Sequence, residues 1–351
     1  MRNMIRRLAV ILLALLLMMP CPSRAEESPE AEGYGGEEAA SEDGAVTEKD
    51  GWHFDAKGFL TGDNPGDEYI LEDEENGFWQ YASKDLSVRI TRVREQYNKK
   101  KIREYCVAEI WASENEPMTS ILTAKKGSWP EGVNQVSPAL LVQKHPCVFA
   151  MSDDYYGSRQ QNILTHTNTL QPGIIIRNGE IRWEKTKART SKYGRHRPCL
   201  DTLAVYSDGS MKTYISDEMT AQEYLEKGAV HTFSFGPWLI SEGKINEKEA
   251  VEGCGYYEQM EPLTGLGMIE PYHYIAIVLR GRPKNKYAGA RLSWLADRLL
   301  ELGCVEALNL DGGGTACMFF NGKAVIQGQE NLRSMGSMIT FGLREETAPD
   351  Q

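Results

Sequence analysis

The chain has 351 residues, 41% of them hydrophobic, which is enough for one large domain or two ordinary ones. Its formal net charge is −11, and this acidic balance argues against nucleic acid as the main partner. The first 25 residues carry four arginines and no acid, and the next 25 carry ten acids and one lysine, so residues 51–351 keep a net charge of −6. This net charge is small enough that residues 51–351 can still contain local basic sites.

The N-terminus has the pattern of a secretory signal peptide over residues 1–25. Arg2, Arg6 and Arg7 precede an apolar run over residues 8–19, and Ser23 and Ala25 supply the small residues of a cleavage site. A retained membrane anchor is the alternative, but the apolar run is shorter than the ~20 residues that a spanning helix needs. We therefore expect an exported protein, secreted or associated with the cell envelope, with no membrane span after cleavage.

Residues 26–65 are expected to form a disordered acidic linker. Residues 26–50 contain ten acids and almost nothing that a core could bury, so this segment repels itself. A spacer is the simpler interpretation, and an interaction tail is the other. The folded domain is then expected over residues 66–346.

Six cysteines remain after the signal peptide, and export would permit disulfides among them. A domain of this size does not need disulfides, so several of the six are expected to be buried thiols. Their spacing relative to histidine has no zinc-binding pattern. The six are Cys106, Cys147, Cys199, Cys254, Cys304 and Cys317.

Alternation of apolar and polar residues predicts strands through most of the domain. Residues 78–111 have the pattern of a long β-hairpin around a basic turn, NKKK. Further strands are expected at residues 148–151, 173–177, 202–206, 238–240 and 275–279. Several of these segments end in Asn-Gly or Asp-Gly, which favour tight turns.

Helical periodicity is confined to two segments. Residues 290–304 place leucines on one face and end at Gly303, and residues 217–229 form a second candidate that starts after Ser216 and stops at Gly228. Many strands with few helices predict an α+β fold. We expect a single domain of mixed or antiparallel sheets with a few packed helices.

The stretch ALNLDGGGTACMFFNGK, residues 307–323, is the most informative part of the sequence. In a strand, Asn309 and Asp311 project from the same face at its carboxyl end. The following glycines let the backbone approach a ligand and direct N–H groups at an anion, and Thr315 adds a hydroxyl. A hairpin turn needs fewer glycines, so a ligand site is favoured over a turn. The glycines are Gly312, Gly313 and Gly314.

The segment LGCVEALNLDGGGTACMFFNGK resembles the signature of the phosphodiester glycosidase family, which is similar to G-x-x-x-A-x-N-L-D-G-G-G-S-S-x-M. Three further blocks resemble the family in the same order: GIIIRNGEI, FSFGPWLISEGKI and VLRGRP. The blocks together cover roughly residues 70–345. The resemblance implies hydrolysis of a bond between a sugar and a phosphate, and bacterial members are associated with exopolysaccharides.

Two blocks depart from the family pattern. Where the family has Asn-Pro-Arg-Thr-Ala, we match EPYHYIA, in which Glu270 and Tyr272 replace the amide and the arginine. An early Asn-Gly-x-Phe loop is replaced by MSDDYYGSR. Arg195 and Arg197 are candidates to supply the missing positive charge. These departures bear on the substrate more than on the fold.

The resemblance and the chemistry together give an expected set of site residues. A departing phosphate needs charge stabilisation, and the anomeric centre needs a carboxylate. Asp311 is expected to act as base or nucleophile and Asn309 to orient the substrate or Asp311, while Arg282 and Arg333 neutralise the phosphate. The second carboxylate is Asp153 or Asp154. The remaining substrate-binding residues are Gly312, Gly313, Gly314, Thr315, Tyr156 and His273.

Several of these assignments have a simpler alternative. Asp153 and Asp154 fit an ordinary polar loop, or together with Asp311 a divalent cation site. Arg282 and Arg333 fit surface charges. No cofactor is required by the expected chemistry.

The sequence therefore predicts an exported hydrolase. Its expected partner is a carbohydrate or glycosyl phosphodiester polymer of the cell envelope or of extracellular polysaccharide. The alternative is a non-catalytic protein that binds glycan or cell wall with a degenerate form of the same fold.

Overall fold

The computed structural model describes residues 47–123, 136–154, 173–184, 199–216, 218–246, 260–282, 286–328 and 331–344. All of these residues belong to one structural unit, residues 44–351. The predicted signal peptide and most of the predicted acidic linker lie outside the described residues. So do Tyr156, Arg195, Arg197 and Cys254.

The largest sheet has nine strands in the order β15-β14-β18-β16-β17-β6-β5-β4-β3, and every pair of neighbours in it that the structure describes is antiparallel. Its strands are β3 (Tyr69–Asp73), β4 (Phe78–Ala82), β5 (Ser87–Asn98), β6 (Lys101–Trp111), β14 (Trp238–Ser241), β15 (Lys244–Ile245), β16 (Leu263–Glu270), β17 (His273–Leu279) and β18 (Glu306–Leu310). The predicted hairpin over residues 78–111 is confirmed as β4, β5 and β6.

Two five-stranded sheets and a short strand pair complete the β structure of the described residues, and their pairings are antiparallel as well. One sheet has the order β10-β9-β13-β11-β12, with β9 (Ile175–Arg177), β10 (Glu180–Trp183), β11 (Asp201–Tyr206), β12 (Met211–Tyr214) and β13 (Ala229–Phe235). The other has the order β20-β19-β8-β21-β7, with β7 (Thr119–Leu122), β8 (Cys147–Ser152), β19 (Cys317–Phe320), β20 (Lys323–Gln327) and β21 (Ser337–Leu343). The pair is β1 (Thr47–Lys49) with β2 (Trp52–Phe54).

The three large sheets share one central hydrophobic core. It contains Ile90 and Leu308 from the nine-stranded sheet. Phe149 and Phe341 come from the five-stranded sheet that contains β8 (the β8 sheet), and Phe233 comes from the one that contains β11 (the β11 sheet). All five side chains are at least 98% buried. Burial of this kind is the main favourable term in folding, so the three sheets are expected to fold as one unit.

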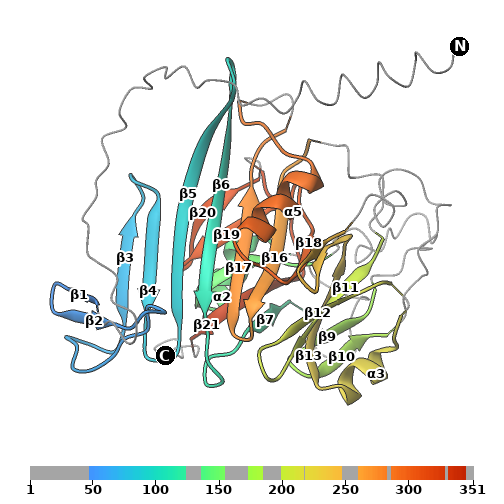
Figure 1. Cartoon of the computed structure of the whole chain (residues 1–351), viewed down its shortest axis with the longest axis horizontal. Coiled ribbons are helices and arrows are strands. Elements are labelled where there is room, and N and C mark those ends of the chain that lie inside the picture. The colour runs from blue at the N-terminus through green and yellow to red at the C-terminus, as the bar shows by residue number, and fades with distance from the viewer. Residues whose placement is uncertain are drawn as a thin grey trace, which may run out of the picture. The chain divides into compact units, whose positions relative to one another are not determined.

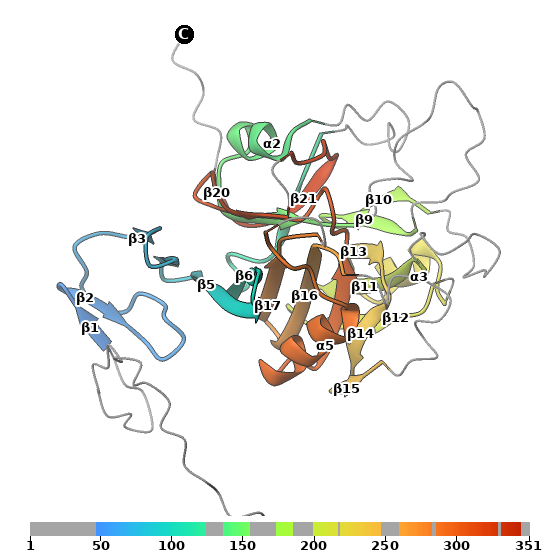
Figure 2. The same ribbon diagram turned by 90° about the horizontal axis from the view of Figure 1, so that it is seen from above.

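Each large sheet carries a helix on its other face. Helix α5 (Leu292–Glu301) lies against the nine-stranded sheet, as Figures 1 and 2 show. Its Leu292, Leu295 and Leu299 are buried in a hydrophobic cluster with residues of that sheet. Helix α2 (Pro138–Lys144) covers the β8 sheet, and helix α3 (Ala221–Glu226) covers the β11 sheet. The helices are short coverings on sheets, so the fold is mainly β rather than the α+β fold that the sequence predicted.

Two predicted boundaries need correction. Residues 47–65, assigned to the disordered linker, contain β1 and β2, and Phe54 and Leu60 are buried against Tyr69 of β3. The acidic composition predicted disorder, but it does not extend past the apolar residues that begin at Trp52. Helix α3 begins at Ala221 rather than after Ser216, because Thr220 and Glu223 form a capping box.

Four of the described cysteines are free thiols. Cys106, Cys147, Cys304 and Cys317 are all buried, and none of these four forms a disulfide. Cys199 is buried as well. Burial raises the pKa of Cys106 and of Cys304 to about 12. The prediction of buried thiols is therefore confirmed for these four positions.

Within the described part of the chain, no helix combines the length and the apolar character needed to cross a bilayer.

Candidate functional site

Asp311 lies directly after β18, where the predicted alternation is confirmed. Leu308 and Leu310 enter the central core, and Ala307 packs on the side of α5. Asp311 is 8% exposed, and its main-chain N–H donates to the Asp153 carbonyl at 3.0 Å. The end of β18 is therefore joined to the end of β8, in another sheet.

The glycines after Asp311 allow close backbone packing. A Cβ atom on Gly312 would lie 2.3 Å from the Pro262 carbonyl oxygen, and Gly313 has a φ of +59°. The Gly313 N–H donates to the same Pro262 oxygen at 2.9 Å. This N–H already has an acceptor, so the predicted anion cradle cannot use it as it stands. The Thr315 hydroxyl donates to the Gly312 carbonyl at 2.7 Å and closes the turn from within.

Arg282 reaches this loop from the segment after β17. Its Nη2 lies 3.1 Å from the position of a Cβ on Gly313, and its Nε lies 3.2 Å from Glu261 Oε2. The Arg282 side chain is 39% exposed, so it can reach a ligand at the loop while paired with Glu261. The structure thus places Arg282 beside the glycine loop.

Arg333 meets the loop through its backbone. The Arg333 N–H donates to the Gly314 carbonyl at 2.7 Å. The residue is exposed. Three segments that are distant in the sequence, at residues 153, 282 and 333, therefore converge on residues 311–315.

Asn309 faces the turn between β13 and β14, where the Gly236–Pro237 peptide bond is cis. Asn309 Nδ2 donates to the Gly236 carbonyl at 2.8 Å, and the two main chains exchange a further bond, Gly236 N–H to Asn309 oxygen at 3.0 Å. Asn309 is 3% exposed, and its Oδ1 has no hydrogen-bond partner among the described residues. That acceptor requires a donor from a ligand or water, because a buried unpaired amide oxygen is unfavourable.

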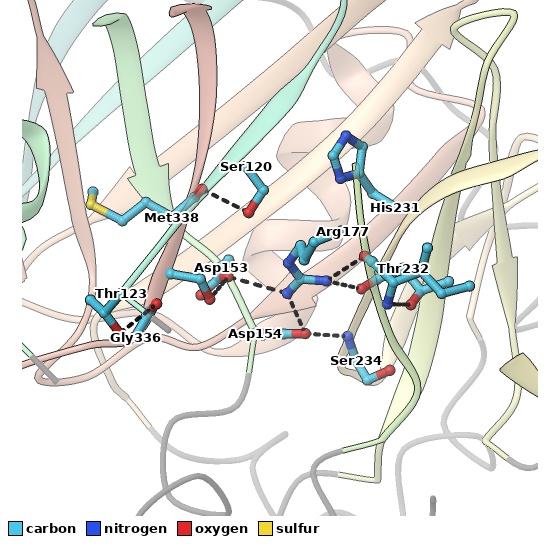
Figure 3. Close-up of polar contacts among 12 residues, drawn as sticks. Ser120, Thr123, Asp153, Asp154, Arg177, His231, Thr232, Ser234, Gly336 and Met338 are labelled. Carbon is cyan, nitrogen blue, oxygen red and sulfur yellow. Dashed lines mark hydrogen bonds and ion pairs between the residues drawn. The ribbon is translucent and has the colours of Figure 1, made fainter. Parts of the chain in front are cut away.

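A buried arginine joins Asp153 and Asp154, as Figure 3 shows. Arg177, the last residue of β9, has no exposed surface, and its Nη2 lies 3.2 Å from Asp153 Oδ2 and 2.8 Å from Asp154 Oδ2. Its Nη1 donates to the Ile176 carbonyl at 3.0 Å and to the Thr232 carbonyl. The two carboxylates thus share one cation in a place that water does not reach.

This acid pair is also tied to the other sheets. Ser337 of β21 donates to Asp153 Oδ2, and the Ser234 N–H of β13 donates to Asp154 Oδ2 at 3.2 Å. Because the Asp153 carbonyl also holds Asp311, one residue connects all three large sheets at the candidate site. One of Asp153 and Asp154 was predicted to be the second catalytic carboxylate, with an ordinary polar loop, or a divalent cation site shared with Asp311, as the alternatives. The positive charge that the structure places between them is the guanidinium of Arg177.

Among the described residues, no group of three or more His, Cys, Asp and Glu side chains has the arrangement of a metal site.

His231 packs behind the acid pair in a neutral form. Its Nδ1 accepts from the Asn178 N–H at 3.3 Å, and its Nε2 lies 3.0 Å from the Met118 carbonyl, which can only accept. The proton therefore lies on Nε2. Burial first, and the nearby Arg177 charge second, lower the pKa of His231 to about 3.

The structure does not bring His273 to the site. His273 is the first residue of β17, and Leu279 at the other end of that strand precedes Arg282, so the two ends lie roughly 20 Å apart. Its ring stacks on Trp111 at 3.5 Å and its Nε2 lies 3.1 Å from Glu109 Oε1. His273 is therefore removed from the candidate site.

The same geometry corrects the match of one family block. Tyr272 occupies the turn between β16 and β17, where its hydroxyl donates to the Ser207 carbonyl at 3.0 Å, far from Asp311. The segment EPLTG, residues 261–265, lies at the loop and keeps both the proline and the threonine of Asn-Pro-Arg-Thr-Ala. We therefore match the block there. Glu261 then replaces the amide and Leu263, buried beneath α5, replaces the arginine.

Sequence reasoning missed Arg177 as a site residue. The signal was present, because an arginine ends the apolar run Gly-Ile-Ile-Ile and shares a strand face with Ile175. A charged residue at such a position is buried only when it is paired.

The class of protein follows from these features and from comparison with known families. The phosphodiester glycosidase family matches over residues 145–341, which is more than half of the chain, and the chain belongs to this family.

The chain is also similar to one protein in sequence and to two solved structures in fold. The chain is 28% identical over 125 residues to the SPbeta prophage-derived uncharacterized protein YomE of Bacillus subtilis (strain 168). That match covers 36% of this chain but only 19% of the length of YomE.

The zebrafish N-acetylglucosamine-1-phosphodiester alpha-N-acetylglucosaminidase catalytic domain, auto-inhibited by its pro-peptide, superposes with a TM-score of 0.54 at 16% identity, covering 79% of this chain and 88% of that one. A hypothetical protein from Synechocystis superposes with a TM-score of 0.50 at 11% identity, covering 76% of this chain and 64% of that one. At these identities the likeness shows the fold.

Proposed function

We propose that this protein hydrolyses a glycosyl phosphodiester, releasing a sugar and a phosphate monoester. Membership of the phosphodiester glycosidase family supports the reaction class. The observation that carries the proposal for this chain is the convergence on residues 311–315 of Arg282, the Arg333 segment and the main chain of Asp153. A carboxylate and a guanidinium on one loop are what cleavage between a sugar and a phosphate requires.

In the proposed reaction the bond between the anomeric carbon and the phosphate oxygen breaks, and its electron pair leaves with the phosphate. Arg282 beside Gly313 stabilises the charge on the departing phosphate, so little protonation of the leaving group is needed. Asp311 acts at the anomeric carbon, either by taking the proton of an attacking water or by forming a glycosyl ester that water then hydrolyses. The anomeric form of the first product, read by NMR, separates the two courses.

Asn309 orients the sugar in this proposal. Its Nδ2 is held by the Gly236 carbonyl at 2.8 Å, which fixes the plane of the amide. The buried Oδ1 is then ready to accept from a sugar hydroxyl. Replacement by aspartate or leucine should therefore weaken substrate binding as well as the Gly236 turn.

The substrate is proposed to lie outside the cell, in the envelope or in extracellular polysaccharide. The support is the signal-peptide pattern of residues 1–25. N-terminal sequencing of the protein recovered from the culture medium or cell wall of its host tests this part, with a start at Glu26 expected.

Hydrolysis is tested with a synthetic N-acetylglucosaminyl phosphodiester, comparing the wild-type chain with Asp311→Asn. Loss of a base or nucleophile should lower the rate at least about 100-fold. Asp297→Asn, an exposed position of α5, removes the same charge and should leave the rate unchanged.

One outcome would favour a different function. If wild type and Asp311→Asn bind the phosphodiester equally and neither releases sugar, the protein is a glycan-binding member of the family. The replacement of the family arginine by Leu263 and the pairing of Arg282 with Glu261 are the observations that favour this second function.

A further inference from the structure

The outer end of the β5–β6 hairpin is strongly basic, although the whole chain is acidic. Residues 92–103 contain six lysines and arginines and one acid, Glu95, which gives a local net charge of +5 against −11 for the whole chain. Pairing between β4 and β5 stops at Phe78 with Thr91, so this end extends past its neighbour, as Figure 1 shows. A charge concentration of this kind on an extended element indicates an anionic partner.

A second basic segment runs beside the hairpin. Residues 280–291 contain five lysines and arginines and no acid. The Arg280 N–H donates to the Glu104 carbonyl at 3.1 Å, and the Ala288 N–H donates to the Ile102 carbonyl at 2.8 Å. Ile102 and Tyr287 also form a β-bridge, so the two basic segments lie side by side.

We call seven of the described basic side chains of these two segments the basic ridge. It consists of Arg94, Lys99, Lys100, Lys101, Arg280, Arg282 and Lys286.

Only part of the ridge is neutralised by nearby acids. Glu104 pairs with both Arg94 and Arg280, and Glu261 pairs with Arg282. Lys99, Lys100 and Lys286 are exposed, and no ion pair joins any of these three to an acid in the described ranges. Their charges therefore face solvent, where a polyanion would displace counterions from them.

The ridge leads from the hairpin tip to the candidate site. Lys101 and Tyr105 are four residues apart on β6, a distance of about 13 Å, and Tyr105 pairs with Leu279, next to Arg280. Two residues further, Arg282 lies against Gly313. The path is longer than a single glycosyl phosphate, so a small substrate at Asp311 would leave most of the ridge unused.

We propose that the basic ridge binds the anionic chain of the substrate on one side of the bond to be cleaved. The substrate class is then a polymer with repeated phosphodiesters, rather than a single glycosyl phosphodiester. This inference rests on the proposed function, because it takes Asp311 as the point of cleavage. A membrane surface would contact the hairpin tip alone, whereas the ridge continues to Arg282 beside Gly313.

The test compares two triple variants that remove equal charge. The ridge variant is Lys99→Gln with Lys100→Gln and Lys286→Gln, and the control variant is Lys84→Gln with Lys227→Gln and Lys244→Gln, all of them exposed positions. The probes are poly(N-acetylglucosamine 1-phosphate) and the methyl diester of N-acetylglucosamine 1-phosphate. Binding is measured by calorimetry on the full-length protein at several salt concentrations.

The ridge variant should bind the polymer at least about tenfold more weakly than wild type, and the slope of log affinity against log salt should fall by about 2 to 3. Binding of the methyl diester should not change, and the control variant should behave as wild type. Equal losses in both triple variants would overturn the proposal. Phosphatidylglycerol vesicles serve as a third probe, for a membrane surface. A ridge variant that keeps its polymer affinity but no longer binds these vesicles would also overturn the proposal.

The two proposals fail in distinguishable ways. If neither probe is hydrolysed but the ridge variant alone loses polymer binding, the proposed reaction is wrong, and the ridge is a polyanion-binding surface rather than one side of a cleavage site. If the methyl diester is hydrolysed and the ridge variant binds the polymer like wild type, the ridge proposal is wrong and the reaction stands.

Discussion

Replacing Arg177 with methionine should lower the free energy of unfolding by about 3 to 5 kcal/mol, the usual effect of removing one partner of a buried ion pair. Arg177 has no exposed surface, and it lies within 3.2 Å of Asp153 and 2.8 Å of Asp154. Methionine keeps most of the apolar stem but leaves two carboxylates, 3% and 2% exposed, without their shared cation. The buried carbonyls of Ile176 and Thr232 also lose a donor, so the upper part of the range is expected.

The measurement is urea unfolding at pH 7, followed by tryptophan fluorescence. Arg298→Met is the matched control, because Arg298 pairs with Glu301 at the surface with side chains 38% and 59% exposed. The free energy of unfolding of that variant should fall by no more than about 0.5 kcal/mol. Adding Asp153→Asn and Asp154→Asn to Arg177→Met should recover part of the loss, since amides carry no charge. A loss below about 1 kcal/mol, or one equal to that of the control, would show that the buried charges are not coupled as described.

Three further predictions follow from burial and backbone geometry. The folded pKa of His231, about 3, lies below its unfolded value, so the stability it contributes is complete above pH 6.5 and falls as pH drops towards 3. Urea unfolding at pH 7, 6 and 5 should show that the free energy of unfolding falls by up to about 1.4 kcal/mol per pH unit below pH 6.5. In His231→Gln the free energy of unfolding should depend less steeply on pH. Gly312→Ala should lower the free energy of unfolding by about 1 to 3 kcal/mol, because its Cβ would meet the Pro262 oxygen at 2.3 Å. Thermal unfolding compares it with Gly66→Ala, which should lose less, because that Cβ would meet nothing closer than Trp52 at 3.5 Å. Cys106, buried with its pKa raised to about 12, should resist iodoacetamide in native protein and react in urea, as mass spectrometry would show.

The parts of the fold that depend on local pattern were predictable from the sequence. Alternation gave the β5–β6 hairpin and the face of β18 that buries Leu308 and Leu310 in the central core. The leucine spacing gave helix α5 and its buried face. In each case the side chains that report the structure lie within a few residues of one another, so period and turn chemistry suffice.

The short helices show how local signals can also be overlooked. Ser137 followed by Pro138 is a helix start, and the Ser137 hydroxyl does accept from the Leu140 N–H at 3.3 Å in α2. Thr220 and Glu223 form the capping box of α3. Both helices run for only two turns or less, which is too short for an amphipathic pattern to develop.

The candidate site was predictable only in part, because its members come from different sheets. Asp311 and its glycines formed one recognisable string, whereas the pairing of Arg177 with Asp153 and Asp154 joins β9 to β8. No residue spacing encodes which sheets stack on one another. The prediction that placed His273 in the site was wrong for the same reason. Only the direction of β17 shows that His273 lies at the end of the strand away from Arg282.

The place of β6 beside β17 limits how far the protein can be shortened. The segment that matches the family begins at residue 145, yet β17 pairs along its whole length, from His273 to Leu279, with residues 105–111 of β6. A fragment starting at residue 145 would expose that entire strand as an unprotected edge, with its apolar residues open to a second chain. Such a fragment should aggregate rather than fold as a minimal domain. The N-terminal strands outside the family match are thus part of the smallest unit that stays soluble.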